Sequence, residues 1–214
     1  MPPARLKRGG HRNLANRVSW QLTERQSRRV IDHSLRAWAE GQPLTRFITL
    51  AWGRAGIDAE RAVWATGQFI DKAREWMRGH GCTMPWVWVQ ETGDTFGQHA
   101  HILLHVPPKL AELFRPMPRR WAKAILRGNY VPRTVRSIRL AGSSAIAANP
   151  ARYHAALMGK LHYILKCAPA PLESTLGLRG WGDKPWGQKT RVIGKRAATS
   201  QRPRSRLLVA KTNL

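Results

Sequence analysis

Apolar residues recur along this chain with a period that changes from one segment to the next. At 23–39 and again at 59–79 they are spaced three and four apart, which predicts two amphipathic helices. Between these helices, 46–52 is a short, mostly apolar run that is typical of a buried strand. Asp58 directly precedes the second periodic segment and is placed to cap its helix.

The middle of the chain predicts a β-hairpin. Two strand-like runs, 86–90 and 100–106, are separated by the turn-forming residues Gly93, Asp94 and Gly97. Prolines then interrupt the pattern after the hairpin. Beyond them we expect a helix, a strand, a longer helix and two short strands, at 119–126, 134–140, 150–166, 191–193 and 207–209.

This order of elements predicts an α+β fold, in which an antiparallel sheet carries helices on one side. We divide the chain into a basic N-terminal arm and helix at 1–40, a main domain at 41–170 and a basic C-terminal extension at 171–214. The arm at 1–20 is expected to be mobile. A length of 214 residues is enough for one domain with a substantial core.

The net charge of the chain narrows the class of its partners. A formal charge of +25 and a pI of about 11.7 favour nucleic acid as the partner, with an anionic membrane surface second. Of these two we expect nucleic acid and no membrane partner. No stretch is apolar enough to span a bilayer, and we expect no secretory signal. The two cysteines, Cys82 and Cys167, lack a paired spacing, which favours reduced thiols and a cytoplasmic protein.

The positive charge is concentrated between Glu112 and Glu173, where no acidic residue occurs. A one-signed region of this length repels itself unless a polyanion binds it, and Lys and Arg contacts to phosphates would supply that affinity. The residues that we expect to bind nucleic acid are Arg115, Arg119, Arg120, Lys123, Arg127, Arg133, Arg136, Arg139 and Lys160. Some of the ten tryptophans could also stack on unpaired bases.

The predicted hairpin brings candidate metal ligands together. His99 and His101 are two residues apart and therefore share a face of the strand. If the chain turns near Thr95, Glu91 lies across from His99 on that face. Two imidazoles and a carboxylate with open coordination positions suit a divalent cation that takes part in chemistry. The alternative is that these are core or surface histidines; His105 is more typical of a supporting or structural residue.

Tyr163 and Lys166 form the second candidate half of a site. They are three residues apart near the end of a predicted helix and so lie on one face of it. A phenol is a nucleophile that can form a phosphodiester with cleaved DNA, and a nearby ammonium can orient the phosphate. The alternative is an aromatic residue at the end of a helix and a lysine that complements the helix dipole.

Taken in order, the strand at 47–52, Glu91 with His99-Ala-His101, and Tyr163-Ile-Leu-Lys166 resemble the three motifs of the HUH endonucleases. The chain is most similar to the single-tyrosine replication initiators (Rep proteins) of rolling-circle plasmids and single-stranded-DNA phages, over about residues 44 to 170. The resemblance implies a ferredoxin-like or RRM-like antiparallel sheet. It also implies Glu91 and both histidines as metal ligands, Tyr163 as the nucleophile and Lys166 as the basic residue of the tyrosine motif.

On this reading the protein nicks and rejoins single-stranded DNA, or an origin hairpin, through a 5′-phosphotyrosine, with Mg²⁺ or Mn²⁺ as the metal. No Gly-x-x-x-x-Gly-Lys motif is present, so a host helicase would be needed. Only Ala100 separates the histidines, and a second tyrosine at helical spacing is missing, since Tyr153 is too far from Tyr163. A single-tyrosine transposase of the same chemistry remains an alternative. A non-catalytic, basic nucleic-acid-binding protein is the alternative of another class.

Overall fold

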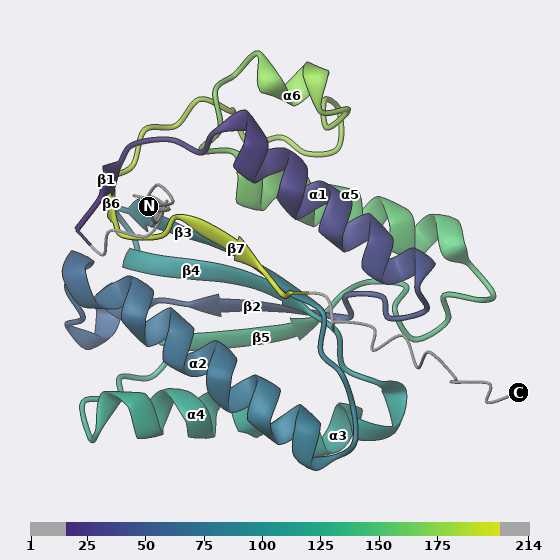
Figure 1. Ribbon diagram of the computed structural model, residues 1–214, viewed down its shortest axis with the longest axis horizontal. Helices are drawn as coiled ribbons and strands as arrows, with labels where there is room; N and C mark the ends of the chain where they lie inside the picture. Colours follow the sequence, from purple (N-terminus) through teal and green to yellow (C-terminus); the bar gives the residue numbers. More distant parts are fainter. Residues whose placement is uncertain (1–15, 202–214) are drawn as a thin grey trace, which may run out of the picture.

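One antiparallel sheet lies between two layers of helices in the computed structural model (Figure 1), which describes residues 16–201. The sheet has five strands in the order β5-β2-β4-β3-β7. In that order they are β5 (Val135–Arg139), β2 (Arg46–Leu50), β4 (Gly97–Leu104), β3 (Trp86–Gly93) and β7 (Ala197–Thr199). Every neighbouring pair is antiparallel. The strand expected at 207–209 and most of the arm expected at 1–20 lie outside the described residues.

The first face of the sheet is covered by α2 (Ala59–Gly79), α3 (Ala111–Phe114) and α4 (Met117–Leu126). Their apolar residues form one buried cluster with Ile48, Trp88 and other strand residues. Two short 3-10 helices, η2 (Trp52–Ala55) and η3 (Pro108–Leu110), join this layer to the strands. The helices that follow β2 and β4 in the chain therefore lie on the same side of the sheet.

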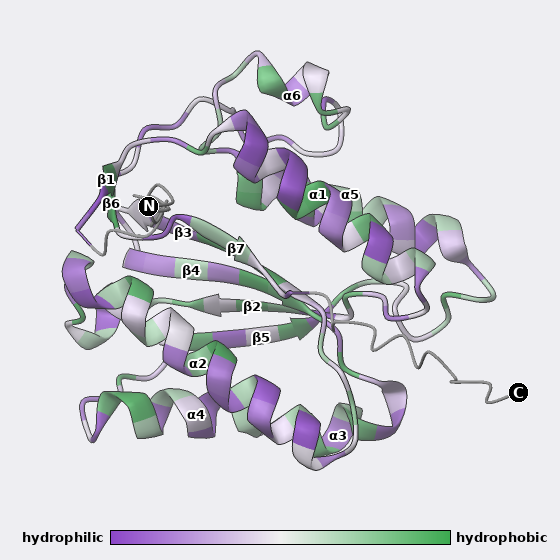
Figure 2. Ribbon diagram, in the orientation of Figure 1, coloured by the Kyte–Doolittle hydropathy of each residue, from purple (hydrophilic) through white to green (hydrophobic). Residues whose placement is uncertain are grey.

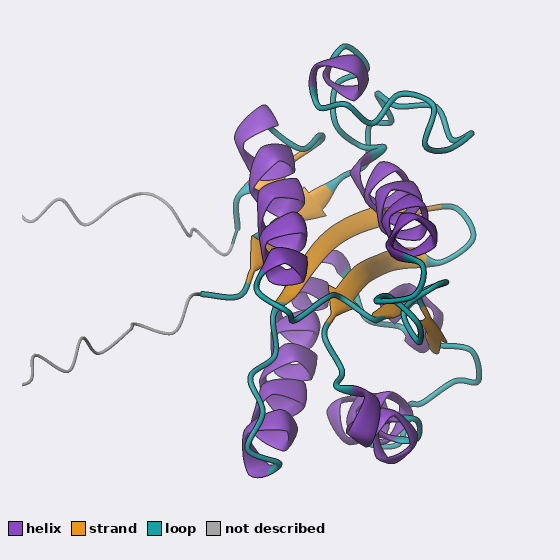
Figure 3. Ribbon diagram, turned by 90° about the vertical axis from the view of Figure 1, so that its right-hand side faces the viewer, coloured by secondary structure: helices purple, strands orange, loops and turns teal. Residues whose placement is uncertain are grey.

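The second face is covered by α1 (Glu24–Ala39) and α5 (Pro150–Leu165), as Figure 3 shows from the side. Val87, Val89 and Leu103 point to this layer and form a second buried cluster with it. The prediction that helices cover only one side of the sheet is therefore wrong. Its physical reason is visible in the strands, which carry apolar residues at consecutive positions and so need cover on both faces.

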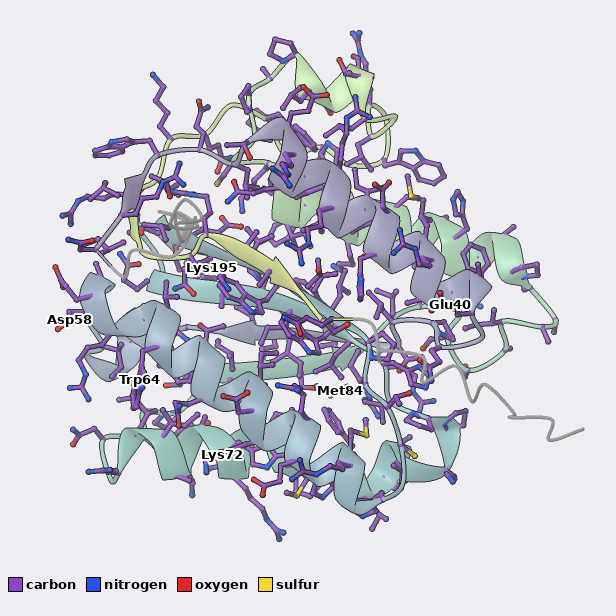
Figure 4. All side chains as sticks on the ribbon, in the orientation of Figure 1. Glu40, Asp58, Trp64, Lys72, Met84 and Lys195 are labelled. Carbon is purple, nitrogen blue, oxygen red and sulfur yellow. The ribbon has the colours of Figure 1, made fainter. Side chains whose placement is uncertain are left out.

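α1, α2 and α5 begin within one residue of where the sequence predicted, because polar caps precede them, whereas α4 begins at Met117, two residues before the expected Arg119. Thr23 forms a capping box with Gln26 at the start of α1. Asp58, labelled in Figure 4, accepts a hydrogen bond from the backbone of Arg61 at the start of α2. Asn149 caps α5 in the same way. Hydrophilic and hydrophobic positions alternate around α1 and α2 in Figure 2, as expected for helices that cover a sheet.

Segments from both ends of the described chain pack together beside the hairpin. β1 (Val18–Ser19) pairs with β6 (Val192–Ile193), which confirms the short strand expected at 191–193. The buried Arg196 donates hydrogen bonds to the carbonyl oxygens of Ser19 and Thr190 and so joins the two segments. A further short helix, α6 (Leu172–Thr175), follows α5. Among residues 16–201, no helix is both long and apolar enough to cross a membrane.

Candidate metal and tyrosine site

The β3–β4 hairpin has the register that the sequence predicted. Glu91 of β3 is paired with His99 of β4, and the strands are joined by three residues, 94–96. Gly97 closes the turn with a φ of +58°, a left-handed conformation that favours glycine. The backbone of Gly53 packs against this turn so closely that a Cβ there would lie 2.7 Å from the carbonyl oxygen of Phe96. The hairpin end is thus held by the first layer of the fold.

Glu91, His99 and His101 converge on the second face of the sheet. Their candidate ligand atoms all lie within 4.8 Å of one another, and all three side chains are buried. The Nε2 atom of His99 is 3.7 Å from a carboxylate oxygen of Glu91, and Nε2 of His101 is 3.6 Å from the other. These distances are too long for hydrogen bonds, so the three groups face a common point without bonding to one another.

Both histidines are held by the nitrogen that faces away from this point. The Nδ1 atom of His99 lies 2.9 Å from the carbonyl oxygen of Gly97, to which it can donate. The Nδ1 atom of His101 lies 3.1 Å from the hydroxyl of Thr49 on β2. Such contacts orient the ring and leave Nε2 as the ligand atom, an arrangement found around metal-bound histidines.

Two polar atoms at the centre of the group have no hydrogen-bond partner among the described residues. They are Nε2 of His101 and one carboxylate oxygen of Glu91, and both are fully buried. A buried polar atom without a partner carries a desolvation cost, which a bound cation would offset. The residues present therefore fit a divalent metal ion with two nitrogen ligands and one oxygen ligand.

The protonation states of these groups also suit a cation. Burial raises the pKa of Glu91, but the neighbouring His99, His101 and Lys166 favour its carboxylate more strongly and hold the pKa at about 2. Burial lowers the pKa of His101 to about 3, although Glu91 opposes that change. Near neutral pH the carboxylate is charged and the His101 imidazole is neutral, which are the states that bind metals.

α5 crosses above this group and adds a lysine to it. Lys166 follows the last residue of α5, and its ammonium donates a hydrogen bond to Glu91 in a buried ion pair. The thiol of Cys167 lies 3.7 Å from the same carboxylate oxygen and 3.8 Å from the hydroxyl of Thr190. Burial, with Glu91 nearby, raises the pKa of this thiol to about 11, so Cys167 is a neutral neighbour of the site.

Tyr163 stands beside the candidate ligands. Its ring centroid is 5.0 Å from that of His101, and the two rings meet edge to face. The ammonium of Lys166 is 4.6 Å from the centroid of the Tyr163 ring, which confirms that the two residues share a face of the helix. Tyr163 is half-buried, so its ring is fixed by neighbours while part of it stays accessible.

The other two tyrosines lie elsewhere. Tyr153 is fully buried, and its hydroxyl donates a hydrogen bond to the carbonyl oxygen of Leu44. Tyr130 packs against the first layer of the fold, on the far side of the sheet from His101. His105 follows β4 and bonds through Nδ1 to the carbonyl oxygen of Pro43, outside the group of candidate ligands. Its place supports the structural role that the sequence analysis favoured.

Phe47 and Thr49 of β2 complete the surroundings of the site, and sequence reasoning did not assign them a role. Phe47 stacks on the His101 ring with centroids 5.5 Å apart, and Lys160 lies 4.9 Å from the centroid of Phe47. Arg136 of β5 is the register partner of Thr49, so it shares the face of the sheet that carries His101. Side chains alternate between the two faces of the sheet along β2, so the sequence indicates that Phe47 and Thr49 share a face. That pattern identifies them as neighbours of the site only once the strand order is known.

The predicted nucleic-acid-binding residues divide between the two faces of the sheet. Arg136 and Lys160 lie on the face of the candidate site, and burial together with Arg136 lowers the pKa of Lys160. Arg139 pairs in register with Arg46 on the opposite face. The others belong to α4 and its flanking segments in the first layer; these are Arg115, Arg119, Arg120, Lys123, Arg127 and Arg133.

Comparison of the chain with models of protein families, with curated proteins and with solved structures finds no match. The geometry of this site and the motifs in the sequence are therefore the features that indicate a function.

Proposed function

We propose that this protein is a metal-dependent endonuclease that nicks and rejoins single-stranded DNA through Tyr163. The main observation in support of the proposal is that the ring centroids of Tyr163 and His101 lie 5.0 Å apart. It places a candidate nucleophile from α5 beside a buried group of candidate metal ligands from the hairpin. These residues are 62 positions apart in number, so their meeting is a property of the fold and not of local sequence.

The topology supports the same proposal. Within the sheet, β2-α2-β3-β4-α4-β5 is a β-α-β-β-α-β unit, and its strands are ordered β5-β2-β4-β3. This is the ferredoxin-like arrangement that the HUH resemblance implies. In our proposal the second face of that unit, between β4 and α5, is the catalytic face. Fold alone does not imply function, so the residues on that face carry the argument.

Glu91, His99 and His101 would hold the metal, and Mg²⁺ and Mn²⁺ are the proposed ions because the set keeps coordination positions open for oxygen ligands. Such an ion would polarise the scissile phosphate and offset the charge that develops on it. The buried, partnerless Nε2 of His101 supports this assignment. The task of the protein is then to keep the His101 imidazole neutral and Glu91 ionised, which the pKa values of about 3 for His101 and about 2 for Glu91 achieve.

In the proposed reaction, the phenol oxygen of Tyr163 attacks the scissile phosphorus. A bond forms between this oxygen and phosphorus, and the bond between phosphorus and the 3′ oxygen breaks. The phenolic proton passes to solvent, and the 3′ oxygen takes up a proton and leaves as a hydroxyl group. The 5′ phosphate stays on the tyrosine, and attack on it by a 3′ hydroxyl reverses the sequence and joins strands.

The neighbours of Tyr163 have separate tasks in this scheme. Phe47 and His101 pack against the tyrosine ring with centroids 6.2 and 5.0 Å away and restrict its orientation. Lys160 lies 5.9 Å from the centroid of the tyrosine ring and Arg136 acts on Lys160 electrostatically, so both would favour a DNA phosphate on this face. Lys166 forms an ion pair with the Glu91 carboxylate and also contacts the Tyr163 ring. We therefore assign it a positioning role, in which it orients both the metal ligand and the tyrosine.

A covalent-adduct assay tests the proposal. The protein is incubated with single-stranded DNA from its own replicon and Mn²⁺, and a species that migrates more slowly under denaturing conditions is the expected result. Mass spectrometry should place the nucleotide on Tyr163. Tyr163→Phe should form no adduct, whereas the matched control Tyr130→Phe should form it normally. An adduct on another tyrosine, or nicking by Tyr163→Phe, would contradict the assignment.

The biological role that we propose is initiation of rolling-circle replication, because the freed 3′ hydroxyl can prime synthesis. The alternative of another class is a non-catalytic binder of nucleic acid, and the basic α4 segment is the observation that favours it. Metal-dependent strand cleavage separates the two. Binding of DNA without cleavage, with Mn²⁺ present and with every candidate origin strand tested, would support the non-catalytic alternative.

A further inference from the structure

We infer that the outer face of α4 is a second nucleic-acid surface, which binds the backbone of duplex DNA separately from the tyrosine site. The inference rests on the proposed function in one respect, since the duplex would be the DNA that flanks the nicked strand. We call this surface the α4 basic surface and define it by five residues, Arg115, Arg119, Arg120, Lys123 and Arg127.

The α4 basic surface lies across the sheet from Tyr163. The inner side of α4 is buried in the first core cluster through Trp121, Ala122 and Leu126. Tyr163 packs against the second cluster, beyond the sheet. A nucleic acid that occupied the tyrosine site would therefore meet α5 and the strand face, and not α4. The long acid-free stretch of the sequence thus supplies two separate surfaces.

The spacing of the basic residues makes a continuous stripe. Arg119 and Lys123 are four residues apart and so share one side of α4, while Arg115 precedes the helix and Arg127 directly follows it. The ten residues of α4 span about 15 Å at 1.5 Å per residue. B-form DNA of that length carries roughly ten phosphate charges, so each cation of the stripe can meet a phosphate.

Most cations of this surface have no acidic partner within the described protein. Glu112 is the one acid of the hollow of about 700 Å³ that Arg115, Arg119, Arg120 and Lys123 line. It contacts Arg115 at 3.7 Å, and both side chains are 79% exposed. In the part of the chain that the structure describes, no carboxylate lies within 4 Å of Arg119, Arg120 or Lys123. Arg119, Arg120 and Lys123 are therefore exposed charges without an acidic counterpart.

Two arginines at this edge adopt a conformation that side chains rarely take. Arg127 ends α4 with a φ of +46°, and Arg133 follows in the next loop with a φ of +68°. No other non-glycine residue among 16–201 has a positive φ. Glycine is the usual residue at such a position after a helix. Arg127 therefore has a strained backbone that glycine would relieve. Because its guanidinium lies at the end of the α4 basic surface, this strain points to a role outside folding.

A duplex fits this surface better than a single strand or a membrane does. Single strands bind through aromatic platforms that stack on bases. The aromatic residue at this surface is Tyr130, and its ring is already flanked by Arg119 and Lys123, each 5.6 Å from its centroid. A membrane-bound helix exposes an apolar face, but the apolar face of α4 is buried. A basic surface without free aromatic side chains can contact phosphates but cannot stack on bases, so it suits the backbone of duplex DNA, whose bases are paired.

Anisotropy measured without metal tests the inference, since no cleavage then occurs. The variant Arg119→Gln/Arg120→Gln/Lys123→Gln is titrated with a blunt DNA duplex, a single strand of equal length, and phosphatidylserine vesicles. The matched control Lys72→Gln/Arg74→Gln/Arg78→Gln removes three charges from the neighbouring helix α2, on which Figure 4 labels Lys72. The first variant should lose about tenfold or more in duplex affinity, and its log–log salt slope should fall by about 3. The control should change both by much less.

Equal losses in the two variants would overturn the inference, because net charge would then explain them. It would also be overturned if the α4 variant lost single-strand or vesicle binding while keeping its duplex affinity. Arg127→Gly gives an independent readout: its melting temperature should be unchanged or raised while its duplex affinity falls several-fold. A lowered melting temperature with unchanged affinity would show a structural role instead. None of these outcomes depends on nicking, so failure of the proposed reaction is recognised separately.

Discussion

Lys166 and Glu91, 75 residues apart in the sequence, form a buried ion pair at the centre of the candidate site. The pair joins the end of α5, the helix that carries Tyr163, to the hairpin. Because Glu91 also faces both histidines, one carboxylate connects the candidate metal ligands to the helix that carries the candidate nucleophile. The candidate site is therefore complete only when α5 is packed on the sheet.

Removal of Lys166 should destabilise the protein when no metal is bound. The Lys166→Met variant leaves the Glu91 carboxylate buried without its ammonium, and breaking a buried pair in this way typically costs about 3 kcal/mol or more. Urea denaturation in EDTA measures the free energy of unfolding. The matched control is Lys160→Met, because Lys160 has no carboxylate within 4 Å among the described residues. If both variants lost the same stability, the ion pair would not be the cause.

The hairpin shows how far the sequence alone could determine the site. Gly93, Asp94 and Gly97 fix the position of the turn, and the turn fixes the register. Residues with a period of two then fall on known faces, so Glu91 was correctly placed opposite His99. Every contact in this step is local, and local contacts are what a single sequence determines best.

The contacts of α5 and β2 could not be obtained in this way. The order β5-β2-β4-β3-β7 depends on pairings between distant segments, so neither Thr49 beside His101 nor Phe47 against its ring was predicted. The same limitation explains the division of the basic residues. Their clustering in the sequence correctly marked a region of unbalanced charge, but it carried no information on which face of the sheet each cation occupies.

His99→Ala and His101→Ala should each abolish binding of Mn²⁺. Each variant removes a strand-borne nitrogen ligand that water does not replace in the same position. Glu91→Gln should weaken binding and retain part of it, since it keeps one oxygen donor. Titration calorimetry gives the result, with His105→Ala as the matched control. His105 is a buried histidine of the same hairpin that bonds to Pro43. Wild-type affinity in the double histidine variant would exclude this metal site.

Acid should destabilise the metal-free protein from about pH 6.5 downward. The pKa of His101 is about 3 in the folded protein and near 6.5 when unfolded, so the unfolded state binds more protons between these values. Stability from this histidine is therefore fully present above pH 6.5 and decreases by about 1.4 kcal/mol per pH unit below it. Glu91, with a folded pKa of about 2, adds to the loss below pH 4.5.

The free energy of unfolding in EDTA at pH 7, 6, 5 and 4 measures this dependence. His101→Asn should show a shallower decrease between pH 6 and 5, because it removes the titrating group but keeps a polar side chain in the same space. A decrease as steep as that of the wild type would show that other groups take up the protons. His105 is the first candidate, because burial lowers its pKa as well.

Lys160 and Arg136 should determine how tightly a single strand is held at the tyrosine site. Lys160 lies over the rings of Phe47 and Tyr163, at 4.9 and 5.9 Å from their centroids, and Arg136 acts on it electrostatically. The two like charges repel each other, and a DNA phosphate beside Tyr163 would offset that repulsion. Lys160→Met and Arg136→Gln should each reduce single-strand affinity and lower the salt slope by about 0.7.

Under single-turnover conditions with saturating DNA, the adduct should still form on Tyr163, because neither residue contacts Glu91 or the histidines. A variant with unchanged affinity and an unchanged salt slope would show that the strand does not pass between these two cations.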